Sequence, residues 1–253
     1  MSQQNEQTTN LKVVVELGDP KTGSRFEEYD VVVDPSMVVL DVIHKIQATD
    51  NLELAVRWNC KAGKCGSCGA EVNGNPKLLC MSKLSDYDLT KPMMVQPMKS
   101  FPLIKDLVTD VSWNYEVNKR IKPYAHPEGL INPRMDQVDV DRVQEFRKCI
   151  ECFLCQDVCH VLRSHSRHDT FAGPRFLVRL AGLEMHPLDT ADRLPEIKNE
   201  FNVGYCNITK CCTEVCPESI PITDEAIIAL KERVADRYYD PLRMVGRFFK
   251  RLF

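Results

Sequence analysis

Long hydrophobic runs are missing from this chain of 253 residues. No window approaches the roughly 18 consecutive apolar residues that identify a transmembrane helix, so we expect any membrane association to be peripheral or to depend on a partner. An excess of positive charge is missing too, because 33 Lys and Arg stand against 36 Asp and Glu. The net charge of -3 disfavours a nucleic-acid partner. The polar start, residues 1–10, contains no cationic patch followed by an apolar stretch, so we expect no secretory signal and reduced thiols.

Cysteine, in contrast, is abundant. The 12 cysteines fall into three groups, at residues 60–80, 149–159 and 206–216, with none between the groups. In a reducing compartment dithiols stay open, so cysteines at this density are expected to bind metal rather than to form disulfides. The clustering predicts separate metal sites.

The first group has the spacing of a plant-type [2Fe-2S] site. Four residues separate Cys60 from Cys65, two separate Cys65 from Cys68, and Cys80 follows at a distance. Gly63, Gly66 and Gly69 alternate with the first cysteines, and a residue without a Cβ lets backbone N–H groups approach the sulfurs. The alternative is a four-cysteine zinc site, although zinc knuckles favour two CxxC pairs and this group has one.

The second group has the bacterial ferredoxin spacing, with intervals of two, two and three residues. In such a run the fourth cysteine serves the other cluster of a pair, so a second run is required. The members of the first run are Cys149, Cys152, Cys155 and Cys159. Counting back from Cys216 by the same intervals gives Cys212, Thr209 and Cys206, so threonine stands at the second ligand position.

Exchange of the fourth ligands predicts one complete and one incomplete cubane. The complete set, for a [4Fe-4S] cluster, is Cys149, Cys152, Cys155 and Cys216. The other set has only Cys159, Cys206 and Cys212. A cubane that lacks a protein ligand at one corner tends to lose that iron, so we expect [3Fe-4S] there. Cys211 is out of register and is expected to be a packed, unreactive thiol.

The first part of the chain is expected to be a small α+β domain, residues 1–105. Strands are predicted at 11–17 and 25–33, followed by a helix from Val39 to Ile46 with Ser36 as a plausible N-cap. After the cysteine loop, Asn73-Gly74 predicts a tight turn between two further strands, at residues 70–72 and 77–79.

The remainder, residues 106–253, is expected to be mainly helical. The proline-rich segment 92–133 is interpreted as a connecting and packing segment. Apolar residues then recur at helical spacing, at Val143, Phe146 and Ile150, at Phe176, Leu177 and Leu180, and at Ile227, Ile228 and Val234.

These motifs, in this order, resemble the iron-sulfur subunit of the succinate dehydrogenase and fumarate reductase family. The resemblance includes residues 101–107, Gly173-Pro174-Arg175 and the closing Cys216-Pro217. It implies a ferredoxin-like β-grasp domain followed by an all-α, bacterial-ferredoxin-like domain, held between a flavoprotein with FAD and a membrane anchor. It also implies that the [2Fe-2S] end faces the flavin and the [3Fe-4S] end faces a quinone, with succinate oxidised to fumarate or the reverse. No catalytic acid or base is expected in this chain.

The sequence departs from many ubiquinone-reducing relatives near the expected quinone. Those relatives have proline and two tryptophans after the fourth cysteine of the middle run, and a histidine after the first cysteine of the last run. Here His160 follows Cys159 and Asn207 follows Cys206. We therefore expect a divergent branch, with menaquinone as a candidate, in which His160, Asn207 and Thr209 contribute to the quinone-side environment. A surface or structural role for His160 is the alternative.

His165 and His168, three residues apart, are expected to be solvated rather than metal-binding. A Rieske centre is not expected, because the first group has all four cysteines. A free-standing multi-cluster ferredoxin and a zinc-stabilised structural protein are the alternatives to a respiratory subunit.

The carboxyl end has the pattern of a basic amphipathic helix. From Pro241 onward the apolar residues Leu242, Val245, Phe248, Phe249 and Leu252 share one face, and basic residues lie mostly on the other. We expect residues 241–253 to lie at the cytoplasmic membrane surface or against the anchor subunit. The alternative is that they pack on the helical domain.

Overall fold

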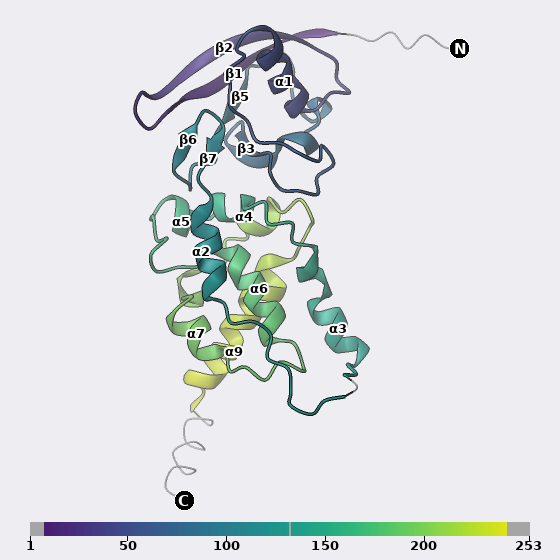
Figure 1. Ribbon diagram of the computed structural model, residues 1–253, viewed down its shortest axis with the longest axis vertical. Coiled ribbons are helices and arrows are strands. Elements are labelled where there is room, and N and C mark those ends of the chain that lie inside the picture. The colour runs from purple at the N-terminus through teal and green to yellow at the C-terminus, as the bar shows by residue number, and fades with distance from the viewer. Residues whose placement is uncertain (1–7, 132, 242–253) are drawn as a thin grey trace, which may run out of the picture. The chain divides into compact units, whose positions relative to one another are not determined.

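The computed structural model describes residues 8–131 and 133–241, which form two compact units (Figure 1). The first unit contains the chain up to Trp113 together with Ile150–Val158, and the second contains Asn114–Cys149 and the chain from Cys159 onward. The first unit is therefore discontinuous in sequence. The domain ranges 1–105, for a [2Fe-2S] domain, and 106–253, for a helical two-cluster domain, stay a prediction.

A five-stranded mixed sheet forms the core of the first unit, with the strand order β2-β1-β5-β3-β4. The predicted hairpin is confirmed, since β1 (Thr9–Asp19) pairs antiparallel with β2 (Gly23–Val33). β1 also pairs parallel with β5 (Met93–Gln96), which in turn pairs antiparallel with β3 (Gly69–Val72). β4 (Asn75–Leu78) closes the other edge beside β3. This β-grasp arrangement confirms the α+β fold class.

The turn between β3 and β4 follows its sequence signal. Asn73 has φ = 50° and Gly74 has φ = 77°, and two successive left-handed residues make the two-residue turn that Asn-Gly favours. The pairing places Leu79 N–H 3.0 Å from Cys68 O. A local turn signal thus brings the chain leading to Cys80 back beside Cys68.

Helix α1 (Val39–Thr49) begins later than its predicted cap. The N-cap is Val38, whose N–H donates to the Asp41 carboxylate at 3.1 Å. Ser36 instead donates its N–H to the Asp34 side chain at 2.6 Å, within the preceding turn. The Ser36 cap was therefore wrong, because a carboxylate at the third helical position satisfies the first backbone donor from inside the helix.

The segment 92–133 is more than a connector. It contains β5, the middle strand of the sheet, and then the short hairpin β6 (Leu103–Lys105) and β7 (Val108–Thr109). Helix α2 (Ser112–Arg120) follows. The interpretation as a connecting and packing segment missed these strands and this helix, because the partners of β5 lie far away in sequence and give no local signal.

Segment 150–158 completes the first unit. It contains the short helix α4 (Leu154–Asp157). Ser100 donates its N–H to the Asp157 carboxylate at 2.9 Å and its hydroxyl to the Asp157 carbonyl at 2.8 Å. The Phe101 and Phe153 rings pack edge to face with centroids 6.5 Å apart. Ile150 lies here, outside any helix, so its predicted place on the Val143 and Phe146 helix was wrong.

The second unit is helical within the described residues, as predicted. Helix α6 (Pro174–Glu184) is amphipathic: Phe176, Leu177, Val178, Leu180 and Ala181 are buried. Besides α6 and most of α2, the second unit contains α3 (Gln137–Gln144), η3 (Glu145–Lys148), α5 (His160–Arg163), α7 (Leu194–Asn199), η4 (Val203–Tyr205), α8 (Cys211–Glu214), the π-helix η5 (Ile222–Ile228) and α9 (Ala229–Tyr238). The first unit also contains η1 (Leu79–Met81) and η2 (Leu84–Asp86).

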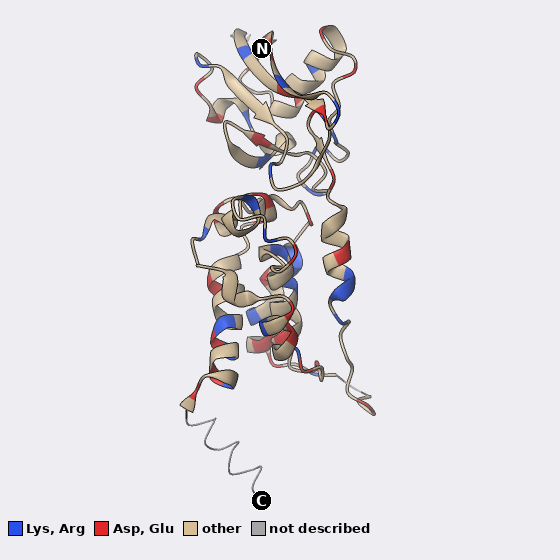
Figure 2. Ribbon diagram, turned by 90° about the vertical axis from the view of Figure 1, so that its left-hand side faces the viewer, with Lys and Arg blue, Asp and Glu red and all other residues tan. Residues whose placement is uncertain are grey.

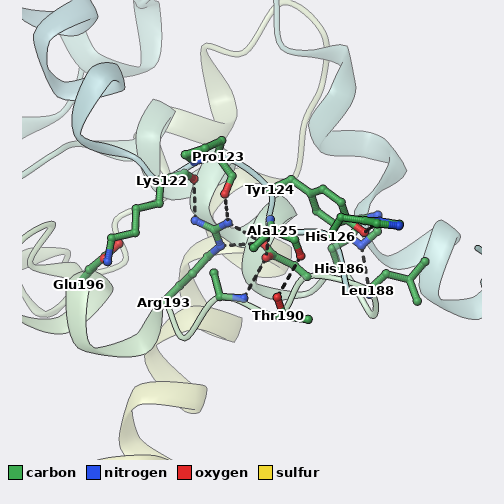
Figure 3. Close-up of polar contacts among 12 residues, drawn as sticks. Lys122, Pro123, Tyr124, Ala125, His126, His186, Leu188, Thr190, Arg193 and Glu196 are labelled. Carbon is green, nitrogen blue, oxygen red and sulfur yellow. Dashed lines mark hydrogen bonds and ion pairs between the residues drawn. The ribbon is translucent and has the colours of Figure 1, made fainter. Parts of the chain in front are cut away.

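A fully buried arginine fastens the chain after α2 to the loop before α7 (Figure 3). Arg193 pairs with the Asp189 carboxylate at 2.6 Å and donates to Lys122 O at 2.7 Å and Pro123 O at 2.8 Å. Asp189 also accepts the Ala125 N–H at 3.1 Å. Each nitrogen of the guanidinium therefore has a hydrogen-bond or ion-pair partner, which is the condition under which a buried charge is tolerated.

Charged residues of both signs occur in each unit. Figure 2 shows Lys and Arg interspersed with Asp and Glu along the ribbon of both units. Among residues 8–131 and 133–241, no helix has the length and apolar character needed to cross a bilayer. Of the predicted carboxyl-terminal amphipathic helix, residues 241–253, all but Pro241 lies outside the described residues.

Candidate metal centres

The loop of the first cysteine group wraps backbone donors around a sulfur. Lys61 and Gly63 have positive φ angles of 51° and 66°, which turn the chain inward. Cys60 Sγ then accepts N–H groups from Ala62, Lys64 and Cys65 at 3.3 to 3.4 Å. Such donors offset negative charge on a thiolate and its metal cluster.

Two thiols of this group have pKa values shifted in opposite directions. The Ser67 hydroxyl donates to Cys65 and lowers the pKa of that thiol to about 6, so it is largely a thiolate at neutral pH. Burial raises the pKa of Cys68 to about 12. Cys80, in η1, is also buried, whereas Cys60 and Cys65 are half-buried. The group thus has an open side and a buried side, and a bound metal would have to deprotonate Cys68.

The same loop lies against the segment that carries two cysteines of the second group. Gly66 has φ = 70°, and a Cβ built on it would stand 2.9 Å from Cys152 Cα and 2.9 Å from Ile150 O. A Cβ on Gly69 would stand 3.2 Å from Leu154 Cδ2. Glycine therefore permits direct backbone contact between the two cysteine-bearing segments within the first unit.

The predicted [4Fe-4S] ligands come from both units. Cys152 and Cys155 are buried in the first unit. Cys149, after η3, and Cys216, after α8, are half-buried and belong to the second unit. Their assignment to one cluster stays a prediction.

The predicted [3Fe-4S] ligands meet around one hollow of the second unit. The hollow has a volume of about 290 Å³, including space open to solvent, and Cys159, Cys206 and Cys212 all line it. Cys159 caps the start of α5, Cys206 follows η4, and Cys212 lies in α8. Burial raises the pKa of Cys159 to about 12 and that of Cys212 to about 11. These thiols would release protons on binding metal, as cluster ligands must.

Thr223, a lining residue that the sequence did not indicate, contacts one of these sulfurs. Its hydroxyl lies 3.4 Å from Cys212 Sγ, and it is buried at the start of η5. It is 11 residues from Cys212. Only the fold brings the two together, so no spacing pattern could have found it.

The three residues predicted for the quinone-side environment also line this hollow. Asn207 and Thr209 are exposed, and His160 is partly exposed. The His160 Nε2 atom is buried and has no hydrogen-bond partner among the described residues. The His165 ring packs near it, with centroids 6.3 Å apart. His165 is exposed to solvent, as predicted. His168 was also predicted to be solvated, but its side chain is only partly exposed.

Cys211 differs from its expected packed state. Its side chain is only partly buried, it lines the hollow with the three predicted ligands, and its Sγ lies 3.3 Å from Thr209 Oγ1. The prediction of a packed thiol was wrong in this respect, because the first turn of α8 points it toward the hollow. Within the described residues, no three His, Cys, Asp or Glu side chains form a site for a single metal ion.

The comparisons with known proteins match both halves of the chain. Residues 10–116 match a 2Fe-2S iron-sulfur cluster binding domain, and residues 145–220 match a 4Fe-4S dicluster domain. The α+β fold class and the predicted cofactors, [2Fe-2S], [4Fe-4S] and [3Fe-4S], are thereby confirmed, while the individual ligands stay predictions. The backbone donors around Cys60 and the thiol-lined hollow suit such clusters.

Individual relatives agree with these domains. A fumarate reductase iron-sulfur subunit of Mycobacterium tuberculosis is 31% identical over 202 residues, which are 77% of this chain and 80% of that protein. A Bacillus subtilis succinate dehydrogenase iron-sulfur subunit is 27% identical, over 78% of this chain and 81% of its own. Two other relatives are much longer, and the chain spans 42% of each.

A solved structure agrees over nearly the whole chain. A chain of the Mycobacterium smegmatis Sdh1 complex, in the apo form, is 56% identical and covers 92% of this chain and 99% of its own, with a TM-score of 0.90. The 2Fe-2S domain precedes the 4Fe-4S dicluster domain, and these relatives match over most of their length. The chain therefore belongs to the succinate dehydrogenase and fumarate reductase family of iron-sulfur subunits.

Proposed function

We propose that this chain carries electrons between the flavin of a dicarboxylate-oxidising subunit and a membrane quinone, as the iron-sulfur subunit of a succinate:quinone oxidoreductase. The observation that carries the proposal is the backbone contact of Gly66 with Cys152 and Ile150. It joins the predicted ligand loop of one cluster to the segment with two predicted ligands of the next. Electron transfer between clusters requires this kind of proximity.

The residues of the chain would hold and tune the clusters. When bound, iron-sulfur clusters accept and release single electrons at potentials set by cluster type, charge, hydrogen bonds and exposure. Cys60, Cys65, Cys68 and Cys80 would hold [2Fe-2S], and the N–H groups around Cys60 would stabilise negative charge there. Cys159, Cys206 and Cys212 would hold [3Fe-4S], with buried Thr223 beside Cys212.

The flavoprotein would dock near the first cysteine loop. Trp58, two residues before Cys60, is 48% exposed, and Met81, next to Cys80, is 53% exposed. Lys61 lies over the Trp58 ring at 5.0 Å. Exposed tryptophan and methionine side chains are enriched in protein interfaces, so this surface suits a protein partner better than solvent.

The quinone would approach the second unit, near the hollow lined by His160, Asn207 and Thr209. A membrane anchor subunit would supply the rest of that pocket. We place the complex at the cytoplasmic face of the plasma membrane, with this chain peripheral and the segment 241–253 near lipid or anchor. Basic residues near an anionic leaflet contribute about 1 kcal/mol each.

Purification of the native complex tests the proposal. We expect the chain to co-purify with a flavoprotein and an anchor subunit, to contain iron and sulfide, and to be reduced by succinate and reoxidised by a quinone analogue. A colourless, zinc-containing protein would refute it. A brown protein that purifies alone and exchanges electrons only with soluble partners would support the free-standing ferredoxin instead.

The reverse reaction, with quinol as donor and fumarate as acceptor, is the second candidate. The name of the Mycobacterium tuberculosis relative favours it, since that protein is a fumarate reductase subunit. Comparing the succinate oxidation and fumarate reduction rates of the purified complex would separate the two directions.

A further inference from the structure

Cys211 is the one cysteine of the 12 that the predicted cluster ligand sets leave unused. Its side chain lines the same hollow as Cys159, Cys206 and Cys212, so four thiols surround this space. Cys211 and Cys212 are the first two residues of α8, so the extra thiol lies directly beside a predicted ligand. A fourth thiol beside a three-thiol cluster site is a potential ligand.

The sulfur of Cys211 lies beside the residue that replaces the missing ligand. Thr209 occupies the second ligand position of the last cysteine run, and its Oγ1 is 3.3 Å from Cys211 Sγ. Two left-handed residues shape this approach, Ile208 with φ = 62° and Lys210 with φ = 64°. The loop thus turns back on itself and places the thiol of residue 211 next to the hydroxyl of residue 209.

Access from solvent distinguishes this corner from the rest of the hollow. Cys159 and Cys212 are buried, whereas Cys211 is partly exposed and both Asn207 and Thr209 are exposed. An iron ion could therefore enter or leave at the Thr209 corner without unfolding of the buried side. A thiol at such a position can bind metal reversibly.

We propose that Cys211 is a conditional ligand, whose thiolate binds a fourth iron beside Thr209 and converts the three-iron cluster of this site to a four-iron cluster. The proposal rests on the proposed function, because it takes Cys159, Cys206 and Cys212 as the cluster ligands. The ligand chemistry is ferrous iron, supplied from solution when the cluster is reduced.

The reaction balances in charge and electrons. One electron, delivered through the chain or by dithionite, reduces the oxidised three-iron cluster from +1 to 0. Ferrous iron then adds its +2 charge to give a +2 four-iron cluster. Cys211 forms the new sulfur–iron bond, and its thiol proton passes to solvent. Removal of one electron and the ferrous ion restores the original cluster and the protonated thiol.

The conversion would make electron transfer at this end of the chain responsive to iron. Cluster type is one of the determinants of reduction potential, so a change from three to four irons changes the potential of the centre that faces the proposed quinone. Thr209 keeps the position open, since a hydroxyl is a weaker iron ligand than a thiolate, and Cys211 fills it only when iron and electrons are both present.

The test compares the native complex with variants. Each sample is reduced anaerobically with dithionite, incubated with ⁵⁷Fe²⁺, desalted and gently reoxidised, and its [3Fe-4S] EPR signal and bound ⁵⁷Fe are measured. We expect the wild type to lose most of the signal and to gain one ⁵⁷Fe per chain. We expect Cys211→Ser and Cys211→Ala to keep the signal and to gain none.

Two further variants calibrate the result. Thr209→Cys places a thiol at the regular ligand position and is expected to contain four irons without added iron, and Thr209→Cys combined with Cys211→Ser should do the same. Iron uptake by Cys211→Ser equal to that of the wild type, or no uptake by the wild type, would overturn the proposal. If the untreated wild type lacks a [3Fe-4S] signal altogether, the set of Cys159, Cys206 and Cys212 as ligands is wrong. That result is distinct from failure of Cys211 to bind a fourth iron.

Discussion

The Thr213 hydroxyl donates a hydrogen bond to the Thr223 hydroxyl at 3.0 Å and accepts one from the Thr223 backbone N–H at 3.0 Å. With its oxygen accepting from Thr213, the Thr223 hydroxyl is left with its own proton to donate. The nearest sulfur is Cys212 Sγ at 3.4 Å. The pair therefore orients a donor toward a predicted cluster ligand.

Replacing Thr223 with valine should lower the reduction potential of the [3Fe-4S] centre. A hydrogen bond to a ligand sulfur favours the more negative, reduced state, and its loss at about 1 kcal/mol corresponds to roughly 40 mV for one electron. Redox titration followed by EPR measures the shift. Thr223→Ser keeps the hydroxyl and should stay close to wild type, and equal shifts in both variants would contradict the hydrogen-bond explanation.

Replacing Arg193 with methionine should strongly destabilise the second unit. The variant leaves the Asp189 carboxylate, which is 2% exposed, without its partner and frees two carbonyls. Removal of one member of a buried ion pair costs about 3–5 kcal/mol. Chemical denaturation of the holoprotein, followed by helical circular dichroism, measures the loss.

Arg237→Met is the matched control. Arg237 pairs with Asp192, which is 56% exposed, and exposed pairs contribute about 0–1 kcal/mol. Arg237 holds the pKa of Asp192 below its ordinary value, so its contribution is present at neutral pH and is lost only as pH falls through that lowered pKa. Similar losses in the two arginine variants at pH 7 would show that burial does not govern the effect.

Alanine at Gly66 should disrupt the contact between the two cysteine-bearing segments. Its Cβ would stand 2.9 Å from both Cys152 Cα and Ile150 O, which is closer than real contacts allow. Gly74 shares the positive φ but has nothing within 4 Å of its Cβ position, so Gly74→Ala measures conformational strain alone. That strain costs about 1 kcal/mol. We expect Gly66→Ala to lose further stability and to slow electron transfer between the clusters, as followed by rapid-freeze EPR.

Serine at Cys216 should damage the [4Fe-4S] cluster and spare the [3Fe-4S] cluster. The reason is the predicted exchange of fourth ligands between runs, which pairs Cys216 with Cys149, Cys152 and Cys155. Cys212→Ser should damage the [3Fe-4S] cluster and spare the [4Fe-4S] cluster. EPR spectra of the oxidised and reduced proteins, with iron analysis, separate the cases; loss of only the [3Fe-4S] signal in Cys216→Ser would show that the runs do not exchange ligands.

The features that the sequence predicted well depend on neighbouring residues. Asn73-Gly74 sets its own turn through two left-handed residues, and the β1–β2 hairpin follows from two β-branched runs close together. The spacing of each cysteine group is also local, which is why the cluster types could be inferred before any fold was known.

The features that the sequence did not predict depend on partners that lie far away in the chain. The central position of β5 comes from β1 and β3, which lie far from it in the chain. Ser100 holds Asp157 across 57 residues, and nothing near either residue indicates that Ile150–Val158 belongs with the sheet. Thr223 reaches Cys212 only through the packing of η5 beside α8, and Asp41 rather than Ser36 supplies the cap of α1.

The return of Ile150–Val158 to the sheet has a consequence for biosynthesis. As the chain leaves the ribosome, the β-grasp sheet can form early, but Gly66 cannot contact Cys152, and Ser100 cannot bond to Asp157, until residues 150–158 have been made. By then residues 114–149, which belong to the second unit, have already been synthesised. The sheet unit is therefore finished only after synthesis of the helical unit has begun, and a fragment that ends at residue 113 would lack the segment that covers its cysteine loop.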